Sequence, residues 1–208
     1  MDARTFVQIV RLGRYPFLLS GFLPFAAGAL LAMLRGADCT LSQFALGYAI
    51  MAASHLSVHH SNDYFDAEAD RFGEPTGVSG GSGILVESPA LKPFAKRFAV
   101  ALMGISLLLA VLFVYRFSFP PLFLLFVVGG NLLGWFYTAP PLKLAYRGLG
   151  EITNMLTFGL LMPGMGYLVA MGWFDLSFFA FSVPFFLYVL VFITSVQMPH
   201  VEGDRIGG

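Results

Sequence analysis

Charged residues are scarce in this sequence. Asp, Glu, Lys and Arg together make up 12% of the 208 residues, whereas hydrophobic residues make up 57%. So few polar side chains cannot cover the surface of a water-soluble globule, and the mean hydropathy of +0.76 agrees with this. The composition therefore predicts an all-α, polytopic transmembrane helical bundle, with residues 1–208 forming a single domain.

Cysteine is almost absent. Cys39 is the one cysteine of the chain, which excludes an internal disulfide framework and a cysteine-rich metal site. The 12 basic and 12 acidic residues cancel, but in a membrane protein the distribution of charge matters more than its sum. We expect the lipid bilayer to surround this chain, and we expect no nucleic-acid partner.

Long apolar runs, by contrast, are abundant. A helix that crosses a bilayer needs about 20 mostly apolar residues. Six segments meet this requirement, at about 15–34, 41–61, 97–115, 118–137, 149–171 and 175–198. The first segment follows Arg4, Arg11 and Arg14, as the apolar core of a signal peptide would. It is longer than such a core and further apolar segments follow it, so we interpret it as the first transmembrane helix.

The basic residues predict the orientation of the chain in the membrane. With the N-terminus in the cytoplasm, every Lys and Arg except Arg35 and Arg116 falls on the cytoplasmic side, as the positive-inside rule requires. Most acidic residues fall on that side too. We therefore expect a multi-pass protein of the cell membrane whose N-terminus and polar site both face the cytoplasm.

An acidic cluster follows the second apolar segment and consists of Asn62, Asp63, Asp66 and Asp70. Read as a helix, the three aspartates are spaced i, i+3 and i+7 and share one face. Neighbouring carboxylates repel one another, and their oxygens suit Mg²⁺, which usually binds one or two carboxylates together with substrate phosphates. In a soluble protein a solvated helix end would be the better interpretation, but this composition favours a metal site.

Two connections on the same side of the membrane contain further candidate site residues. The glycine-rich residues 77–83 suit an anion-binding turn or a flexible linker, and residues 84–87 could cover the acidic cluster. In the connection at 137–148, Pro140 and Pro141 end the preceding helix and stiffen the turn. Lys143 and Arg147 are thereby held in place, either for charge balance or as phosphate ligands.

Together these residues resemble the UbiA superfamily of intramembrane prenyltransferases. The first motif of that family, N-D-x-x-D-x-x-x-D, is matched by Asn62, Asp63, Asp66 and Asp70. Its Tyr-Thr-x-Pro-Pro loop is matched by Tyr137, Thr138, Pro140, Pro141, Lys143, Arg147 and Gly148. Its second acidic motif, D-x-E-x-D, is met at Glu202 and Asp204. The resemblance extends from Arg11 to Arg205.

The chain departs from the family pattern in two respects. His200 stands where the second motif usually begins with Asp, which removes one carboxylate from a second metal site, and imidazole binds Mg²⁺ poorly. The family usually has about nine helices, whereas six apolar segments are present here. From this difference we expect the sequence to be truncated at its C-terminus.

The resemblance implies Mg²⁺-dependent transfer of a polyprenyl group from its diphosphate to an aromatic acceptor. The implied metal ligands are Asn62, Asp63, Asp66, Asp70, Glu202 and Asp204. Lys143, Arg147 and Arg71 would bind the remaining phosphate oxygens, and Tyr64 and Tyr137 would stabilise the allylic cation. Residues 80–87 and Pro199 are most similar to the enzymes that prenylate dihydroxynaphthoate on the way to menaquinone.

Two other functions are compatible with parts of this pattern. Intramembrane carboxylates also mark the ion pathways of transporters, but a transporter predicts charges near mid-membrane and an inverted repeat. This chain instead gathers its acidic residues at one membrane face. The other alternative is an inactive prenyltransferase fragment, which would explain both His200 and the number of apolar segments.

Overall fold

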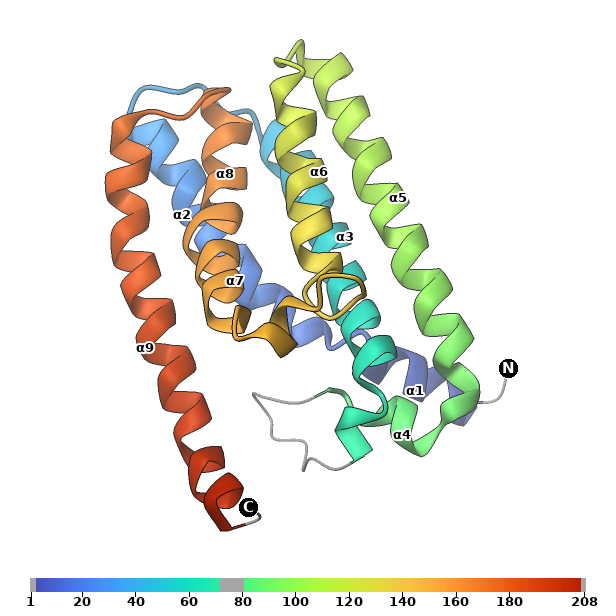
Figure 1. Ribbon diagram of the computed structural model, residues 1–208. Helices are drawn as coiled ribbons and strands as arrows, with labels where there is room; N and C mark the ends of the chain where they lie inside the picture. The colour runs from blue at the N-terminus through green and yellow to red at the C-terminus, as the bar shows by residue number, and fades with distance from the viewer. Residues whose placement is uncertain (1–2, 72–80, 207–208) are drawn as a thin grey trace.

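The structure of the chain is helical throughout its regular elements. The computed structural model describes the backbone of residues 3–71 and 81–206 and the side chains of residues 5–71 and 81–192. Every regular element within these ranges is a helix, and the long ones run along a common direction (Figure 1). The prediction of an all-α bundle is therefore confirmed.

Each of the six predicted apolar segments is helical. They correspond to α2 (Leu18–Leu34), α3 (Leu41–Asp66), α5 (Lys92–Phe117), α6 (Leu122–Trp135), α7 (Gly150–Leu156) with α8 (Met162–Met171), and α9 (Leu176–Ile206). A π-helical turn at Thr157–Leu161 joins α7 to α8. Among the described residues, three stretches are both long and apolar enough to cross a membrane: Thr5–Leu34, Pro89–Phe117 and Gly150–Met171. Residues 122–135 and 176–192 form shorter apolar helices.

Helix α3 begins at a complete capping box. Thr40 accepts a hydrogen bond from the backbone N–H of Gln43, and the side chain of Gln43 accepts one from the backbone N–H of Thr40. These bonds satisfy N–H groups that have no partner in the first turn of a helix. The helix then continues without a break for 26 residues to Asp66. The helix therefore spans the bundle, and its last turn places Asp63 and Asp66 at the site.

Aromatic and aliphatic side chains fill the core, and a series of hydrogen bonds links three helices within it. Phe25, Phe113 and Phe123 are among the buried residues of the largest cluster. Within the core, Ser106 Oγ donates to the Ile50 carbonyl at 3.0 Å, and Asn131 Nδ2 donates to Ser106 Oγ at 3.3 Å. Because polar groups without a partner are costly inside a bilayer, these bonds fix α3, α5 and α6 relative to one another.

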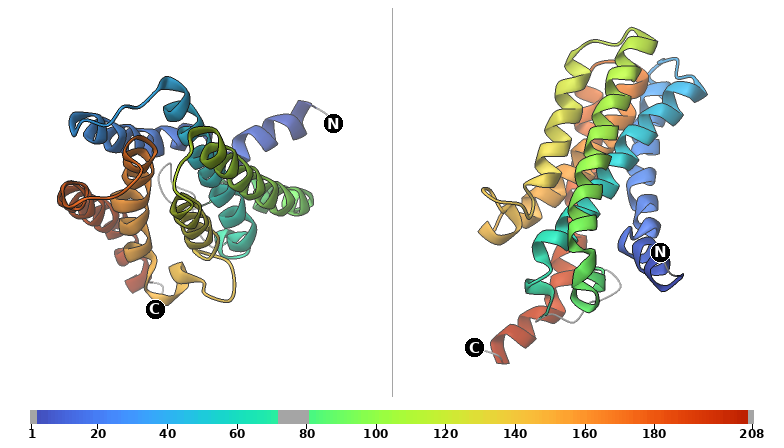
Figure 2. Two further views of the ribbon diagram at one scale, coloured as in Figure 1. Left: turned by 90° about the horizontal axis from the view of Figure 1, so that it is seen from above. Right: turned by 90° about the vertical axis from the view of Figure 1, so that its right-hand side faces the viewer.

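The connections that carry the predicted site residues gather at one end of the bundle. Figure 1 shows α1 (Ala3–Leu12), α4 (Ile84–Glu87) and the α6–α7 connection at this end, and the α2–α3, α5–α6 and α8–α9 connections at the other. Helix α1 projects sideways from the bundle axis (Figure 2). Leu12 of α1 packs with Ile84 and Leu85 of α4 in a buried cluster. Ala67, directly after α3, belongs to the same cluster, so the stretch at 84–87 packs next to the end of α3.

Candidate functional site

Asp63 lies in the last turn of α3 and is almost fully buried, at 4% exposure. The backbone N–H of Ser82 donates to Asp63 Oδ1 at 3.1 Å and lies 3.4 Å from Oδ2. Ser82 belongs to the glycine-rich connection that precedes α4, so this bond brings that connection onto the end of α3. Within the described residues, the glycine-rich stretch thus supplies an N–H donor to a carboxylate, as an anion-binding turn would.

Asp70 reaches the same place from a different element. Helix α3 ends at Asp66, and Asp70 lies in a separate 3₁₀ turn, Ala69–Arg71. A Cβ atom added to Gly81 would collide with the carboxylate of Asp70 and lie 3.2 Å from Asp63 Oδ1. Both carboxylates therefore converge on Gly81. The expected continuous helical face through Asp70 is not formed, and the turn after α3 brings this residue back instead.

Burial raises the pKa of the Asp70 carboxyl group above its ordinary value. Two interactions act in the opposite direction, the hydrogen bond from the Gly81 backbone and the positive charge of Arg14. Arg14 lies between α1 and α2, with a left-handed backbone (φ 45°) and its guanidinium 4.3 Å from the centre of the Phe17 ring. Nothing in the local sequence around Arg14 links it to the acidic cluster.

Asp66 is held by the connection between α6 and α7. The hydroxyl group of Tyr146 donates to Asp66 Oδ1 at 2.5 Å. Burial and this hydrogen bond both raise the pKa of Tyr146, so the phenol stays protonated and remains a donor at neutral pH. Lys143 Nζ lies 5.9 Å from the centre of the Tyr146 ring, and its charge acts on Asp66. Residue spacing gives no indication of Tyr146 as a site residue, because 80 positions separate it from its acceptor.

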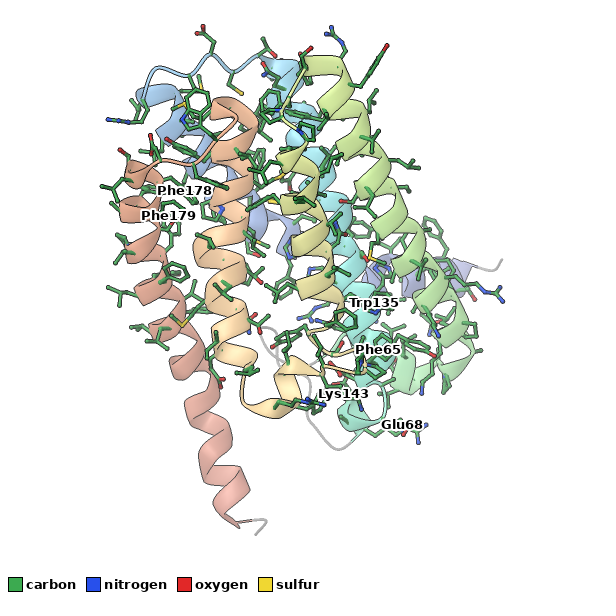
Figure 3. All side chains as sticks on the ribbon, turned by 45° about the horizontal axis from the view of Figure 1, so that its top comes forward. Phe65, Glu68, Trp135, Lys143, Phe178 and Phe179 are labelled. Carbon is green, nitrogen blue, oxygen red and sulfur yellow. The ribbon has the colours of Figure 1, made fainter. Side chains whose placement is uncertain are left out.

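Further hydrogen bonds join the same connection to the bundle. Thr138 donates to Asn62 Oδ1 at 2.9 Å, and Asn154 Nδ2 donates to the Tyr137 hydroxyl at 3.1 Å. Thr138 is buried. Four predicted site residues, Asn62, Asp66, Tyr137 and Lys143, are thus brought together by the α6–α7 connection. Figure 3 shows Lys143 at this end of the bundle, with Glu68, Phe65 and Trp135 near it, whereas Phe178 and Phe179 lie at the start of α9, towards the other end.

Other predicted residues lie elsewhere or outside the described side chains. Tyr64 faces α5, where Lys96 Nζ lies 5.3 Å from its ring centre. Arg147 is exposed and donates to the Pro141 carbonyl at 2.9 Å, and Arg71 is exposed as well. The side chains of Glu202 and Asp204 fall outside the described residues. In the part of the chain whose side chains are described, no three His, Cys, Asp or Glu residues are grouped closely enough to hold a metal ion.

Three histidines lie on α3 just before the acidic cluster. Within the described structure, His55 Nδ1, His59 Nε2 and His60 Nε2 are buried and have no hydrogen-bond partner. The rings of His55 and His59 lie 4.6 Å apart, and the ring of Phe17 meets His59 edge-on. The ring of His60 instead packs against Phe98 of α5, and its Nδ1 lies 2.8 Å from the Leu56 carbonyl. Two of the histidines therefore face α2, and the third faces α5.

Comparison with known proteins identifies the family. The sequence pattern of the UbiA prenyltransferase family matches residues 21–208. The chain belongs to this family. It is also 26% identical to the 1,4-dihydroxy-2-naphthoate octaprenyltransferase of Bacillus subtilis over 192 residues. This alignment covers 92% of this chain and 60% of that protein.

Two solved structures share the UbiA fold. A UbiA homologue from Archaeoglobus fulgidus, bound to GPP and Mg²⁺, superimposes with a TM-score of 0.72 at 22% identity and covers 95% of this chain and 65% of its own. The complex of such a homologue with DMAPP and Mg²⁺ gives 0.67 at 21% identity, over 90% and 62% of the two chains. The chain thus spans somewhat less than two thirds of the relatives that it matches.

The residues at this end of the UbiA bundle have the chemistry that a hard cation prefers, although the three aspartates of the described structure are not grouped closely enough to hold one together. Asp63, Asp66 and Asp70 supply carboxylate oxygens, which are the ligands that Mg²⁺ prefers. A side chain on Gly81 would fill the space that the carboxylates of Asp63 and Asp70 share. Each aspartate also accepts a hydrogen bond from a different partner, Ser82, Tyr146 or Gly81. Such outer partners fix the orientation of ligating side chains.

Proposed function

We propose that this chain is part of a membrane enzyme that transfers a prenyl group from a magnesium-bound diphosphate to an aromatic acceptor. The convergence of Asp63 and Asp70 on Gly81 supports this most directly. Asp66 ends the same helix, and the turn that carries Lys143 lies beside it. Membership of the UbiA family supports the reaction class.

In this proposal Asp63, Asp66 and Asp70 hold Mg²⁺, and Asn62 contributes a neutral oxygen. The ion would neutralise the charge that builds up on the diphosphate as the donor's C–O bond breaks. Lys143 binds a phosphate oxygen as a point charge. Arg14 adds a second positive charge, since its charge already lowers the pKa of Asp70. Glu202 and Asp204 remain predicted ligands of a second ion.

The bond changes determine what the surroundings must do. When the C–O bond breaks, its electron pair leaves with the diphosphate, and an allylic cation remains. The acceptor ring then attacks the allylic carbon, a C–C bond forms, and the ring proton is lost to the diphosphate or to water. Until then water must be excluded, because it would capture the cation. Tyr137, whose hydroxyl is fixed by Asn154, presents an aromatic face that stabilises positive charge.

The acceptor that the observations favour is 1,4-dihydroxy-2-naphthoate, with a polyprenyl diphosphate as donor, in the biosynthesis of a menaquinone-like quinone. The similarity to the Bacillus subtilis enzyme supports this choice. We also propose that the site faces the cytoplasm in the cell membrane. The connections that carry the predicted site residues lie together at the end of the described bundle that carries α1, and the basic residues of the sequence predict that this end is cytoplasmic.

Prenyl transfer can be measured directly. Membranes from cells that express the complete gene are given labelled geranyl diphosphate and 1,4-dihydroxy-2-naphthoate, with Mg²⁺ or with EDTA. We expect a prenylated product that EDTA abolishes. Asp66→Asn should lower turnover by about 100-fold or more, because stabilisation by the metal is worth several kcal/mol.

The matched control for Asp66→Asn is Glu68→Gln, an exposed carboxylate two residues further along the chain. We expect this variant to retain its activity, since Glu68 carries the same charge without contacting the site. Full turnover in Asp66→Asn would contradict the metal assignment. Product formation that is unaffected by EDTA would contradict the reaction itself.

A further inference from the structure

We propose that Tyr146 is the positioning residue for Asp66 and sets the affinity of the site for its metal ion. The proposal rests on the proposed function, because it concerns the same magnesium site. It adds a residue from outside the acidic motif, and it gives the connection between α6 and α7 a role in metal binding.

The hydrogen bond itself is the first support. Tyr146 donates to Asp66 Oδ1 at 2.5 Å, and 80 residues separate the two in sequence. A bond between a hydroxyl group and a carboxylate at such a distance belongs to the strong, charge-assisted class. It engages one carboxylate oxygen and leaves Oδ2 for the cation. The bond also restricts the terminal torsion of Asp66, which is otherwise broadly distributed in aspartate.

The turn that carries Tyr146 is itself fixed. The backbone N–H of Leu144 donates to the Phe136 carbonyl at 3.1 Å, and that of Ala145 donates to the Tyr137 carbonyl at 2.9 Å. The N–H of Tyr146 donates to the Lys143 carbonyl at 2.9 Å. The turn is therefore attached to the end of α6, so the position of the phenol is set by the bundle.

Lys143 connects this arrangement to the substrate. Its ammonium group lies 5.9 Å from the Tyr146 ring centre, within the range of a cation–π interaction. The same side chain is the proposed ligand of a phosphate oxygen. Tyr146 thus contacts the residue that holds the metal and the residue that holds the diphosphate, so both would be oriented by one aromatic side chain.

Metal binding provides a measurement that does not depend on turnover. Mn²⁺ binding to the purified complete protein is followed by electron paramagnetic resonance in the presence of geranyl diphosphate. Tyr146→Phe should weaken Mn²⁺ binding about 10- to 100-fold, the usual effect of losing an outer partner of a metal ligand. The Mg²⁺ concentration for half-maximal turnover should rise by a similar factor. Tyr146→His, which keeps an N–H donor, should recover part of the affinity.

Two controls make the result interpretable. Tyr146 is 54% exposed, and Tyr115, in the last turn of α5 away from the site, is 87% exposed. Neither Phe variant should therefore unfold the protein, and thermal melting verifies this. Tyr115→Phe should bind Mn²⁺ like the wild type. Wild-type affinity in Tyr146→Phe, combined with weakened binding in Asp66→Asn, would overturn this inference alone. Absence of Mn²⁺ binding to the wild type would overturn the proposed function and this inference with it.

Discussion

A single hydrogen atom in place of a side chain decides how close two carboxylates can come. Gly81 is not in a left-handed conformation, so its backbone does not require glycine. The space around it does, because a Cβ atom would collide with Asp70 and lie 3.2 Å from Asp63 Oδ1. The carboxylates that we assign to the metal therefore meet where the glycine-rich connection has no side chain.

We accordingly predict that Gly81→Ala weakens binding of magnesium and geranyl diphosphate about tenfold or more. The added methyl group must displace Asp70 or move the chain, and forcing extra volume into a filled site costs about 1–3 kcal/mol. Binding of the labelled diphosphate measures this. Gly104→Ala is the matched control, since nothing lies within 4 Å of a Cβ atom on Gly104. Equal affinity in both variants would show that Gly81 does not shape the site.

At this scale the sequence predicted the acidic residues but not their partners. The motif spacing predicted Asp63, Asp66 and Asp70 because these residues lie close together in the sequence. Their arrangement is not local, since α3 ends at Asp66 and a turn brings Asp70 back beside Gly81. Tyr146 is 80 residues away from its acceptor, and Arg14 acts on Asp70 across the fold. Such contacts depend on tertiary packing, which residue spacing does not reveal.

The helices themselves were predictable, because hydrophobic segments of this length leave few alternatives in a bilayer. Where they pack most closely was not. Helices α2 and α8 approach until their backbones touch, since a Cβ atom on Gly28 would overlap the Pro163 carbonyl and one on Gly166 would overlap the Phe25 carbonyl. Small residues permit such close approach between membrane helices. Gly130 and Gly129, by contrast, have open space around them.

This contact predicts that Gly166→Val destabilises the protein. The side chain cannot fit without separating α2 from α8, which should cost at least about 1–3 kcal/mol and lower the melting temperature by about 5 °C or more. Melting in detergent, followed by circular dichroism, measures the change. Gly130→Ala should melt at the wild-type temperature or above, because alanine has the higher helix propensity. A Gly166→Val protein with wild-type stability would mean that the two helices do not meet there.

Seen as a whole, the chain gathers the candidate catalytic residues at one end of the bundle. The α1 end holds the acidic cluster, Tyr146, Lys143 and Arg14, whereas the α2–α3 and α5–α6 connections lie at the opposite end (Figure 1). A donor with a charged head and a hydrocarbon tail suits this arrangement, because the diphosphate can stay at one membrane face while the tail lies among the helices. The proposed function therefore requires the α1 end to face the compartment that supplies both substrates and Mg²⁺.

Thiol labelling tests that orientation. Cys39 is the one cysteine in the sequence, so Cys39→Ser gives a background into which single cysteines can be placed. Asp38 is exposed in the α2–α3 connection, and Glu68 is exposed beside the acidic cluster. With the N-terminus in the cytoplasm, a membrane-impermeant maleimide added to intact cells should label Asp38→Cys. Glu68→Cys should react once the membrane is permeabilised. The reverse pattern would place the acidic cluster on the outer face, away from cytoplasmic Mg²⁺ and diphosphates, and the proposed reaction would then lack its substrates.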